Sequence, residues 1–346
     1  MKIAIVNHEG GFSERWIKYC KDRHVSYKTV NPYANDIIDQ VSDCDAIMWH
    51  YSHSDYKDAL FAKQLLYSMM LMGKKVFPDF QTTWHFDDKV GQKYLLEAIG
   101  APFVPTYVFY DQDEALKWAD NTSFPKVFKL RGGAGSENVK LVLTKRHARK
   151  LIKKAFTIGF SQYDGWSSLK ERYGKWRNGR APFIHVVKGV ARLFVTTNYA
   201  KMHPKEKGYI YFQDFIPQNS YDIRVIVTGD KAFAIKRIVR DGDFRASGSG
   251  NILYAKEELD ERTVRVAFDV NDKLNSQSLA LDFVFDTNRN PLIVEMSYGY
   301  AVHGYDPCPG YWTKDMKWHE EKFIPQYWQI DNLLNSISSS EDINTD

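Results

Sequence analysis

The chain has 346 residues, a net charge of +4, and 26% charged against 44% hydrophobic residues. We expect two or three domains, because a single hydrophobic core stops growing at about 250–300 residues. A net charge of +4 over this length is too small to indicate a nucleic-acid-binding surface, and no apolar run reaches the ~18 residues that a membrane span needs. We therefore predict neither nucleic-acid binding nor membrane insertion.

The cysteines and the first residues indicate the compartment. Cys20, Cys44 and Cys308 are far apart and odd in number, and none forms a CxxC pair. This spacing predicts a reducing environment without a disulfide framework or structural zinc. The opening MKIAIVNHEGG has an apolar core too short for a signal peptide and predicts a strand. We expect a cytoplasmic protein.

Residues 1–85 alternate short apolar runs with amphipathic stretches. We predict strands at 3–6, 25–30, 46–49 and 75–77, and helices at 13–22, 34–41 and 54–72. Such a βαβ series predicts a small open parallel sheet. Its first turn, Asn7 to Gly11, lacks the GxGxxG spacing of a dinucleotide site, so a carboxylate or amine substrate at the strand ends is the alternative.

The next segment centres on a glycine cluster, KLRGGAGSENVKLV at 129–142. It is not a Walker A loop, because no Gly-Lys-Ser/Thr follows Gly135. Nor is it a dinucleotide fingerprint, because Asn138 takes the place of the third glycine and a strand pattern, not a helix, follows. Short β-prone runs flank the glycines on both sides, so we predict a β-hairpin flap.

The other elements follow from periodicity and turn signals. Helices are predicted at 87–99 (ending at Gly100), 112–119, 148–156 and 257–275. Strands are predicted at 106–110 and 209–215, and hairpins at 223–227 with 232–238 and at 279–285 with 291–296. Residues 158–205 show no clear pattern, and the polar end of the chain predicts a disordered tail.

Two carboxylates interrupt the apolar strands of the last hairpin. Asp282 lies within LALDFVF and Glu295 within LIVEM. A carboxylate inside an apolar strand costs several kcal/mol unless it is paired or binds a cation. Two of them on neighbouring antiparallel strands can converge on one hard ion such as Mg²⁺. The alternative is that each pairs with a lysine or arginine across the sheet.

Basic residues are spaced along the same half of the chain. Lys89 begins the long helix, Lys129 enters the glycine flap, and Arg224 follows Asp222 in YDIRVIV. Four more crowd AIKRIVRDGDFRAS: Lys236, Arg237, Arg240 and Arg245. Any one of these fits a solvated strand face. Together with the flap and the buried carboxylates, they are the parts needed to hold a nucleotide triphosphate between two sheets.

In this order, the motifs resemble those of the ATP-grasp carboxylate–amine ligases, closest to the glutathione synthetases and ribosomal-protein glutamate ligases. They are Asp88-Lys89, Lys129 with RGGAGSENV, FQDFIP (212–217), YDIRVIV (221–227), KR with DFRAS (236–247), and LDF with IVEMS (281–297). The resemblance implies an ATP-grasp fold, of classes α/β and α+β, behind a Rossmann-like N-terminal domain. The domains expected are 1–85, 86–205 with the flap, 206–335 with the metal site, and a tail at 336–346.

The resemblance also assigns roles by position. The residues expected to bind ATP are Lys89, Lys129, Gly132, Gly133, Gly135, Ser136, Gln213, Asp214, Phe215, Ile216, Asp222 and Lys236. The ligands expected for Mg²⁺, or Mn²⁺ in its place, are Asp282, Glu295 and Ser297. Arg240 and Arg245 would face the transferring phosphoryl group. Two positions depart from the family: Ser297 replaces an asparagine, and Ala280 stands where some members have an arginine.

The activity implied is ATP-dependent amide formation through an acyl phosphate, on small-molecule carboxylate and amine substrates. The aromatic tail after the metal strand resembles those of proteins associated with surface-polysaccharide assembly, which adds a carbohydrate to the candidates. Near the metal strand we expect substrate contacts from Arg224, Tyr298, Tyr300 and His303. His50 and His53, in WHYSHSDY, suit a solvated loop or a substrate contact better than zinc. A homodimer is compatible with the sequence. The rival functions are a phosphotransferase and a non-catalytic nucleotide-binding protein.

Overall fold

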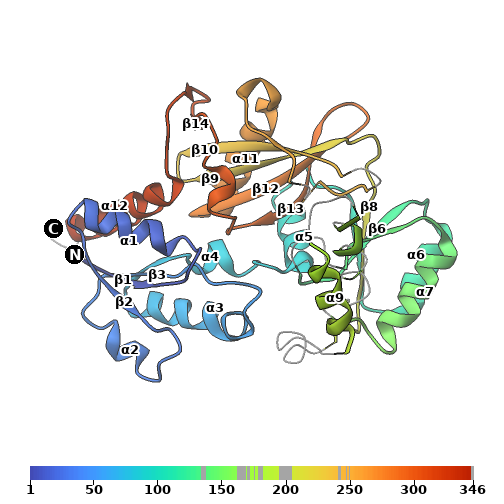
Figure 1. Cartoon of the computed structure of the whole chain (residues 1–346), viewed down its shortest axis with the longest axis horizontal. Helices are drawn as coiled ribbons and strands as arrows, with labels where there is room; N and C mark the ends of the chain where they lie inside the picture. Colours follow the sequence, from blue (N-terminus) through green and yellow to red (C-terminus); the bar gives the residue numbers. More distant parts are fainter. Residues whose placement is uncertain are drawn as a thin grey trace.

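The computed structural model describes residues 1–133, 138–161, 169, 172–174, 176–177, 182–194, 205–240, 243–246, 248 and 250–343. Within them the chain forms a parallel sheet followed by two antiparallel sheets (Figure 1). The predicted combination of α/β and α+β architecture is confirmed. Among the helices described, none has both the length and the apolar character needed to cross a bilayer.

The N-terminal sheet is parallel, with strand order β2-β1-β3-β4. Its elements are β1 (Lys2–Val6), α1 (Ser13–Asp22), β2 (Ser26–Val30), α2 (Ile37–Gln40), β3 (Ala46–Met48), α3 (Tyr56–Leu71) and β4 (Lys75–Phe77). Alternate strand residues enter two cores: Ile3 and Ile5 pack towards α1, and Ala4 and Val6 pack towards α3. Covered on both faces, this sheet is open to ligands only at its strand ends.

A second sheet, antiparallel, has the order β5-β8-β6-β7. Its strands are β5 (Thr106–Phe109), β6 (Lys126–Lys129), β7 (Lys140–Val142) and β8 (Ile210–Asp214), and α6 (Gln112–Asn121) and α7 (Lys145–Phe156) pack on one face. β6 and β7 pair directly, so the predicted hairpin is confirmed. β8 pairs with β5 and β6, so this sheet continues past the boundary predicted at residue 205.

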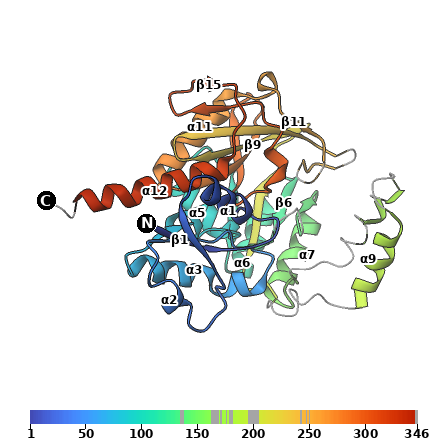
Figure 2. The same ribbon diagram turned by 60° about the vertical axis from the view of Figure 1, so that its left-hand side comes forward.

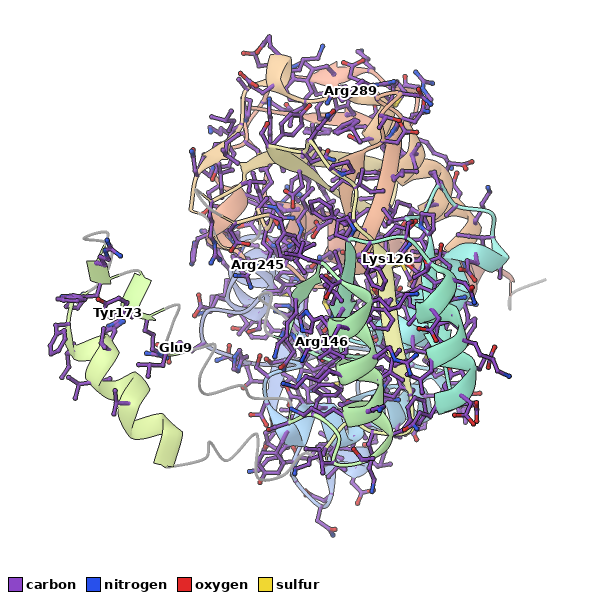
Figure 3. All side chains as sticks on the ribbon, turned by 90° about the vertical axis from the view of Figure 1, so that its right-hand side faces the viewer. Glu9, Lys126, Arg146, Tyr173, Arg245 and Arg289 are labelled. Carbon is purple, nitrogen blue, oxygen red and sulfur yellow. The ribbon has the colours of Figure 1, made fainter. Side chains whose placement is uncertain are left out.

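Part of the unassigned segment forms helix α9 (Ile184–Phe194). Figure 2 shows α9 to one side of the body of the molecule. Figure 3 shows Tyr173 on the same side, well apart from Arg245.

The third and largest sheet is antiparallel and fills the C-terminal half. Its strands are β9 (Tyr221–Thr228), β10 (Lys231–Ile238), β11 (Ile252–Leu253), β12 (Ser278–Phe285), β13 (Pro291–Ser297), β14 (Tyr311–Thr313) and β15 (Trp318–His319). The helical elements around it are α4 (Phe80–Thr83), α5 (Lys89–Ala98), η1 (Lys256–Glu258), α11 (Glu261–Leu274) and η2 (His303–Tyr305). Leu96 of α5 and Val264 of α11 share a core with Val225 and Leu281 on one face of the sheet.

Helix α12 (Pro325–Ile343) returns the chain to the N-terminal sheet. Ile330, Leu333 and Ile337 lie at helical spacing and join the core that contains Trp16 of α1. The disordered tail that we expected from residue 336 is therefore wrong as far as residue 343. The polar composition of this end conceals an apolar stripe, of which Ile337 is part.

Candidate active site

A cavity of about 1020 Å³ is lined by residues of the two antiparallel sheets and of the loops that follow two strands of the parallel sheet. Ligand pockets commonly measure about 300–1,000 Å³, so this one has room for a large ligand or for two ligands side by side. The loops after β1 and β3 line one end of it, and β8 with the segment that follows lines another part.

Asp282 and Glu295 stand directly opposite each other on β12 and β13, and both line the cavity. The pairing register shifts immediately after them, a β-bulge of the kind that re-aims side chains next to functional sites. The expectation that these two carboxylates lie on neighbouring antiparallel strands and face one space is confirmed.

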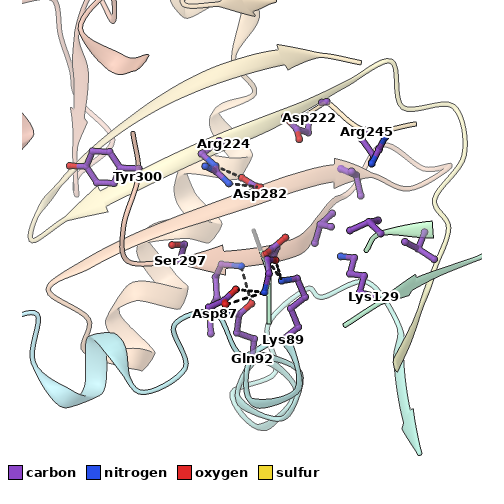
Figure 4. A pocket seen from close by; sticks show the side chains of 18 of the residues that line it. Asp87, Lys89, Gln92, Lys129, Asp222, Arg224, Arg245, Asp282, Ser297 and Tyr300 are labelled. Atoms are coloured by element: carbon purple, nitrogen blue, oxygen red, sulfur yellow. Dashed lines mark hydrogen bonds and ion pairs between the residues drawn. The ribbon is translucent and has the colours of Figure 1, made fainter. Parts of the chain in front are cut away.

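Asp282 is held by two arginines, and Figure 4 shows its contacts with one of them, Arg224. Arg224 Nη2 donates to its Oδ2 at 2.7 Å, and Arg237 Nη2 lies 2.9 Å from the same oxygen. Burial alone would raise the pKa of Asp282, but these two guanidinium groups lower it well below its ordinary value. Asp282 is therefore an anion at neutral pH although its side chain is only 11% exposed.

Arg237 extends the network to a second carboxylate. Its Nη2 lies 2.6 Å from Asp222 Oδ2, and its Nε donates to Oδ1 at 2.7 Å. Burial raises the pKa of Asp222, and the attraction of Arg237 opposes that rise. Arg224, Asp282, Arg237 and Asp222 thus form a row of alternating charge along β9, β10 and β12, which we call the arginine–aspartate row.

Glu295 is paired with the lysine that begins α5. Lys89 Nζ lies 3.2 Å from Glu295 Oε1 and donates to the carbonyl oxygen of Gly133 at 2.7 Å. Burial would raise the pKa of Glu295, but Lys89 and then Lys129 lower it. The Lys89 side chain reaches the cavity because Asp88 caps α5, its carboxylate accepting the N–H of Gly91. Each carboxylate therefore has a basic partner, as in the second alternative drawn from the sequence, and both line one cavity, where their binding of a shared cation stays a prediction.

Lys129 approaches the same space from β6. Its Nζ donates to Gln213 Oε1 at 2.7 Å, and Gln213 Nε2 donates to Thr106 Oγ1 at 3.1 Å. Burial lowers the pKa of Lys129 to about 8, a drop that Glu295 partly offsets. Beyond Gln213, the next residues of the predicted adenine strand also line the cavity: Asp214, Phe215 and Ile216. Asp214 pairs with Lys126 at 2.5 Å.

Gly133 marks the base of the predicted flap and lines the cavity. Its N–H donates to the Asp87 carboxylate, 2.8 Å from one oxygen and 3.0 Å from the other. Gly132 is buried beside it. Gly135 and Ser136, also predicted to bind the nucleotide, lie outside the described residues.

The remaining predicted residues divide between the cavity and other places. Arg245, Ser297 and Tyr300 line the cavity. Arg245 is ion-paired with Asp243 at 2.7 Å, and Ser297 Oγ donates to the carbonyl oxygen of Gly299 at 2.9 Å.

Five predicted residues are not among the described residues that line the cavity: Gly132, Lys236, Arg240, Tyr298 and His303. Lys236 pairs with Glu258 at 2.6 Å. Tyr298 is fully buried and donates to the carbonyl oxygen of Tyr51 at 3.0 Å. His303 has a 76% exposed side chain 3.2 Å from Asp306. Next to two of them in sequence, Arg237 belongs to the arginine–aspartate row and Ser297 lines the cavity.

Sequence reasoning passed over Arg237 in favour of Lys236. Adjacent strand residues face opposite sides of a sheet, so only one of the two can face Asp222 and Asp282. The two-residue turn Gly229-Asp230 pairs Thr228 with Lys231, and counting back along the hairpin places Arg237 opposite Asp222. The register of that turn was the signal that could have identified Arg237.

Oxygen ligands for a cation come from the two facing strands, β12 and β13. In the part of the chain that the structure describes, no three His, Cys, Asp or Glu side chains are grouped to hold a metal ion. Asp282, Glu295 and the Ser297 hydroxyl nevertheless line one cavity, and hard cations such as Mg²⁺ need only one or two carboxylates when phosphate oxygens complete the shell.

Comparison with known proteins agrees with this geometry. Residues 193–306 match the family model of the RimK-like ATP-grasp domain. The chain has the ATP-grasp fold. No curated protein gives a significant match to the sequence.

Three solved ATP-grasp structures illustrate the likeness. The biotin carboxylase domain of Hydrogenobacter thermophilus 2-oxoglutarate carboxylase, solved with MgADP and bicarbonate, has 15% identity and a TM-score of 0.58 over 96% of this chain and 69% of its own. D-alanine–D-alanine ligase from Bacillus anthracis has 12% identity and a TM-score of 0.56 over 99% of both chains. A RimK-domain ATP-grasp protein from Sphaerobacter thermophilus has 12% identity and a TM-score of 0.54 over 96% and 99%.

Proposed function

We propose that this protein is an ATP- and Mg²⁺-dependent ligase that joins a carboxylate to an amine through an acyl phosphate, releasing ADP and phosphate. The observation that carries the proposal is the facing pair Asp282 and Glu295, set among Lys89, Lys129 and Arg224 in one cavity. Two ATP-grasp neighbours were solved with nucleotides: the biotin carboxylase domain with MgADP, and the B. anthracis ligase with ATP.

The nucleotide would lie between the second and third sheets. Lys89 and Lys129 would contact its phosphates, and Gln213 to Ile216 would border the adenine. Asp222 would accept hydrogen bonds from the ribose hydroxyls, since a carboxylate bound by one arginine still has lone pairs to offer. Burial of the lysines strengthens their attraction for phosphate, because water screens the charges less.

The oxygen donors present fit Mg²⁺, with Mn²⁺ as the alternative, and Asp282, Glu295 and Ser297 would hold it. Bound there, the ion would neutralise charge on the transferring phosphoryl group. Arg224 and Arg237 already stabilise the ionised form of Asp282, so this ligand needs no deprotonation at neutral pH.

In the first chemical step, an oxygen of the substrate carboxylate attacks the γ-phosphorus, and the bond to the bridging oxygen of ADP breaks. Arg224 and Arg245 line the cavity and would bind the substrate carboxylate or the phosphoryl oxygens. In the second step, the amine nitrogen attacks the acyl carbon and phosphate leaves with its bonding electron pair. The carbon–nitrogen bond and one lost proton complete the amide.

For the substrates we propose a sugar acid or an amino acid used in cell-surface polysaccharide assembly. The support is the aromatic tail after β13, of which Tyr300 lines the cavity. A flat ring at the cavity wall suits a bulky substrate such as a sugar.

The test is ADP and phosphate release from ATP over a matrix of carboxylates, including uronic acids, and amines, including amino acids, with Asp282→Asn as the inactive control. We expect release that needs both a carboxylate and an amine. No turnover with any pair, in protein that still binds ATP, would contradict the ligase. A stable phosphorylated product formed without amine would identify a phosphotransferase in its place.

A further inference from the structure

The end of the cavity next to the N-terminal sheet is rich in histidine, and we call it the histidine end: His8, His50 and His53. His8 follows β1, and His50 and His53 follow β3, so three imidazoles line the cavity at the carboxyl ends of two adjacent strands. The strand order reverses between β1 and β3, the place where open α/β sheets bind ligands.

His50 is fixed as a hydrogen-bond donor. Its Nδ1 accepts the N–H of Phe12 at 3.2 Å, and its ring stacks on that of Phe12 with centroids 3.7 Å apart. In the neutral ring the proton must then be on Nε2. Burial lowers the pKa of His50 to about 3, so the ring stays neutral. Nε2 lies beside Gly299, where an added Cβ would be 3.1 Å from it.

His53 is placed differently. Its ring makes an edge contact with Phe86, with centroids 5.4 Å apart. Among the described residues, neither ring nitrogen of His53 has a hydrogen-bond partner, so one nitrogen lone pair is open to a ligand in the cavity. The charged groups that act on it are Asp87, Lys89 and Glu295. Burial lowers the pKa of His53, and the two carboxylates partly oppose that.

Charge divides the cavity in two. Its lysines and arginines are Lys89 of α5, Lys129 of β6, Arg224 of β9, and Arg245 in the segment between β10 and β11. The lining residues up to position 53 include no Lys, Arg, Asp or Glu: His8, Gly10, Gly11, His50, Tyr51, Ser52 and His53. Phosphates and a carboxylate suit the cationic side. The uncharged side suits an amine in its neutral form, the only form that has a lone pair for attack.

We propose that the histidine end is the amine subsite and that His53 is the base that accepts the proton of the attacking amine. The inference rests on the proposed function. As the amine nitrogen bonds to the acyl carbon, the open nitrogen of His53 takes one N–H proton, and phosphate leaves with the electrons of the C–O bond. The imidazolium then loses this proton to solvent. His50, which can only donate, would orient an acceptor atom of the amine substrate.

Hydroxylamine separates this role from the earlier step, because it is largely unprotonated at neutral pH and traps acyl phosphates without help from a base. The experiment compares wild type with His53→Asn in two assays on ATP with glutamate, alanine or glucuronate. One assay measures hydroxamate formed with hydroxylamine. The other measures ADP released with the best amine of the substrate matrix. His24→Asn is the matched control, because His24 is an exposed histidine of the same domain and asparagine tolerates its φ of +54°.

We expect His53→Asn to keep hydroxamate formation within about twofold and to lose amine-dependent turnover by about 100-fold, the lower range for general base catalysis. An equal loss in both assays would overturn the inference and make His53 structural. Unchanged amine turnover would overturn it too. If wild type formed no hydroxamate from any of the three acids, the proposed function and the inference would both be contradicted. A loss in His53→Asn that is confined to the amine assay would support both.

Discussion

The arginine–aspartate row and the histidine end border one cavity but differ in the charge of their buried groups. The row keeps Asp282 ionised despite burial, because two guanidinium groups lower its pKa, whereas for Asp222 one guanidinium group only opposes the rise that burial causes. At the histidine end, His50 stays neutral, because burial there is not compensated by an opposite charge. Charged groups suit the stabilisation of phosphate and metal, and neutral imidazoles suit proton acceptance and donation. Under the proposed function, this contrast would let one cavity serve two chemical steps.

The largest effect on activity is expected from removing a charge from the arginine–aspartate row. We expect Asp282→Asn to lower ADP formation by on the order of 1,000-fold, the upper range for the loss of one preorganised electrostatic group. The mutant leaves Arg224 and Arg237 without their shared anion. Steady-state ADP release measures the effect. Asp120→Asn, on an exposed pair with Arg149, is the control and should retain full activity. A mutant within tenfold of wild type would remove Asp282 from the reaction.

The row should also matter for folding. Arg237→Met leaves Asp222 and Asp282 with exposed fractions of only 14% and 11% and without a shared partner. Breaking a buried pair costs about 3–5 kcal/mol, so we expect a loss of that size in the free energy of unfolding, measured by urea titration.

Arg149→Met breaks an exposed pair with side chains 39% and 42% exposed. Such pairs contribute about 0–1 kcal/mol, so this mutant should unfold almost like wild type. Equal losses in the two mutants would mean that the buried row adds nothing special to stability.

The pH dependence of ATP affinity tests the role of Lys129 on the cationic side of the cavity. Burial lowers its pKa to about 8, and a bound phosphate would raise it again, so the ATP complex binds more protons than the free protein. ATP affinity should therefore hold below this pKa and weaken above it, by up to about tenfold per pH unit. Titration calorimetry from pH 6.5 to about 9.5 measures this trend. Lys129→Arg, which stays charged, should flatten the profile; an unchanged slope in that mutant would assign the proton to another group.

The smallest effect is expected outside both regions. His303 was predicted to contact substrate, but its side chain is exposed and pairs with Asp306. His303→Ala should change kcat/KM by less than about twofold, as surface changes away from a site usually do little. A larger loss, measured on the same substrate pair as the histidine mutants, would mean that the site extends along the segment after β13.

Period-two alternation and turn signals were enough to predict much of this molecule. They located the strand pair of Asp282 and Glu295 and the hairpin that carries Lys129. These elements depend on neighbours in sequence, and local pattern describes them well.

What the sequence left open depends on distant contacts. Tyr298 and Tyr300 are two residues apart after β13, yet one is buried against Tyr51 and the other lines the cavity. Nor does local pattern show that β8 pairs with β5, more than 100 residues earlier in the chain. Tertiary packing decides such matters, and spacing along the chain does not report it.

Lys89 shows what the site can accept without rearranging. An ammonium group has three N–H bonds. Within the described residues, one points to Glu295 and one to the carbonyl oxygen of Gly133. The third remains for an incoming oxygen atom. A phosphate oxygen can therefore accept the third hydrogen bond of this ammonium group without displacing either protein partner. The strand, the helix and the glycine loop that Lys89 joins need not separate when a nucleotide binds.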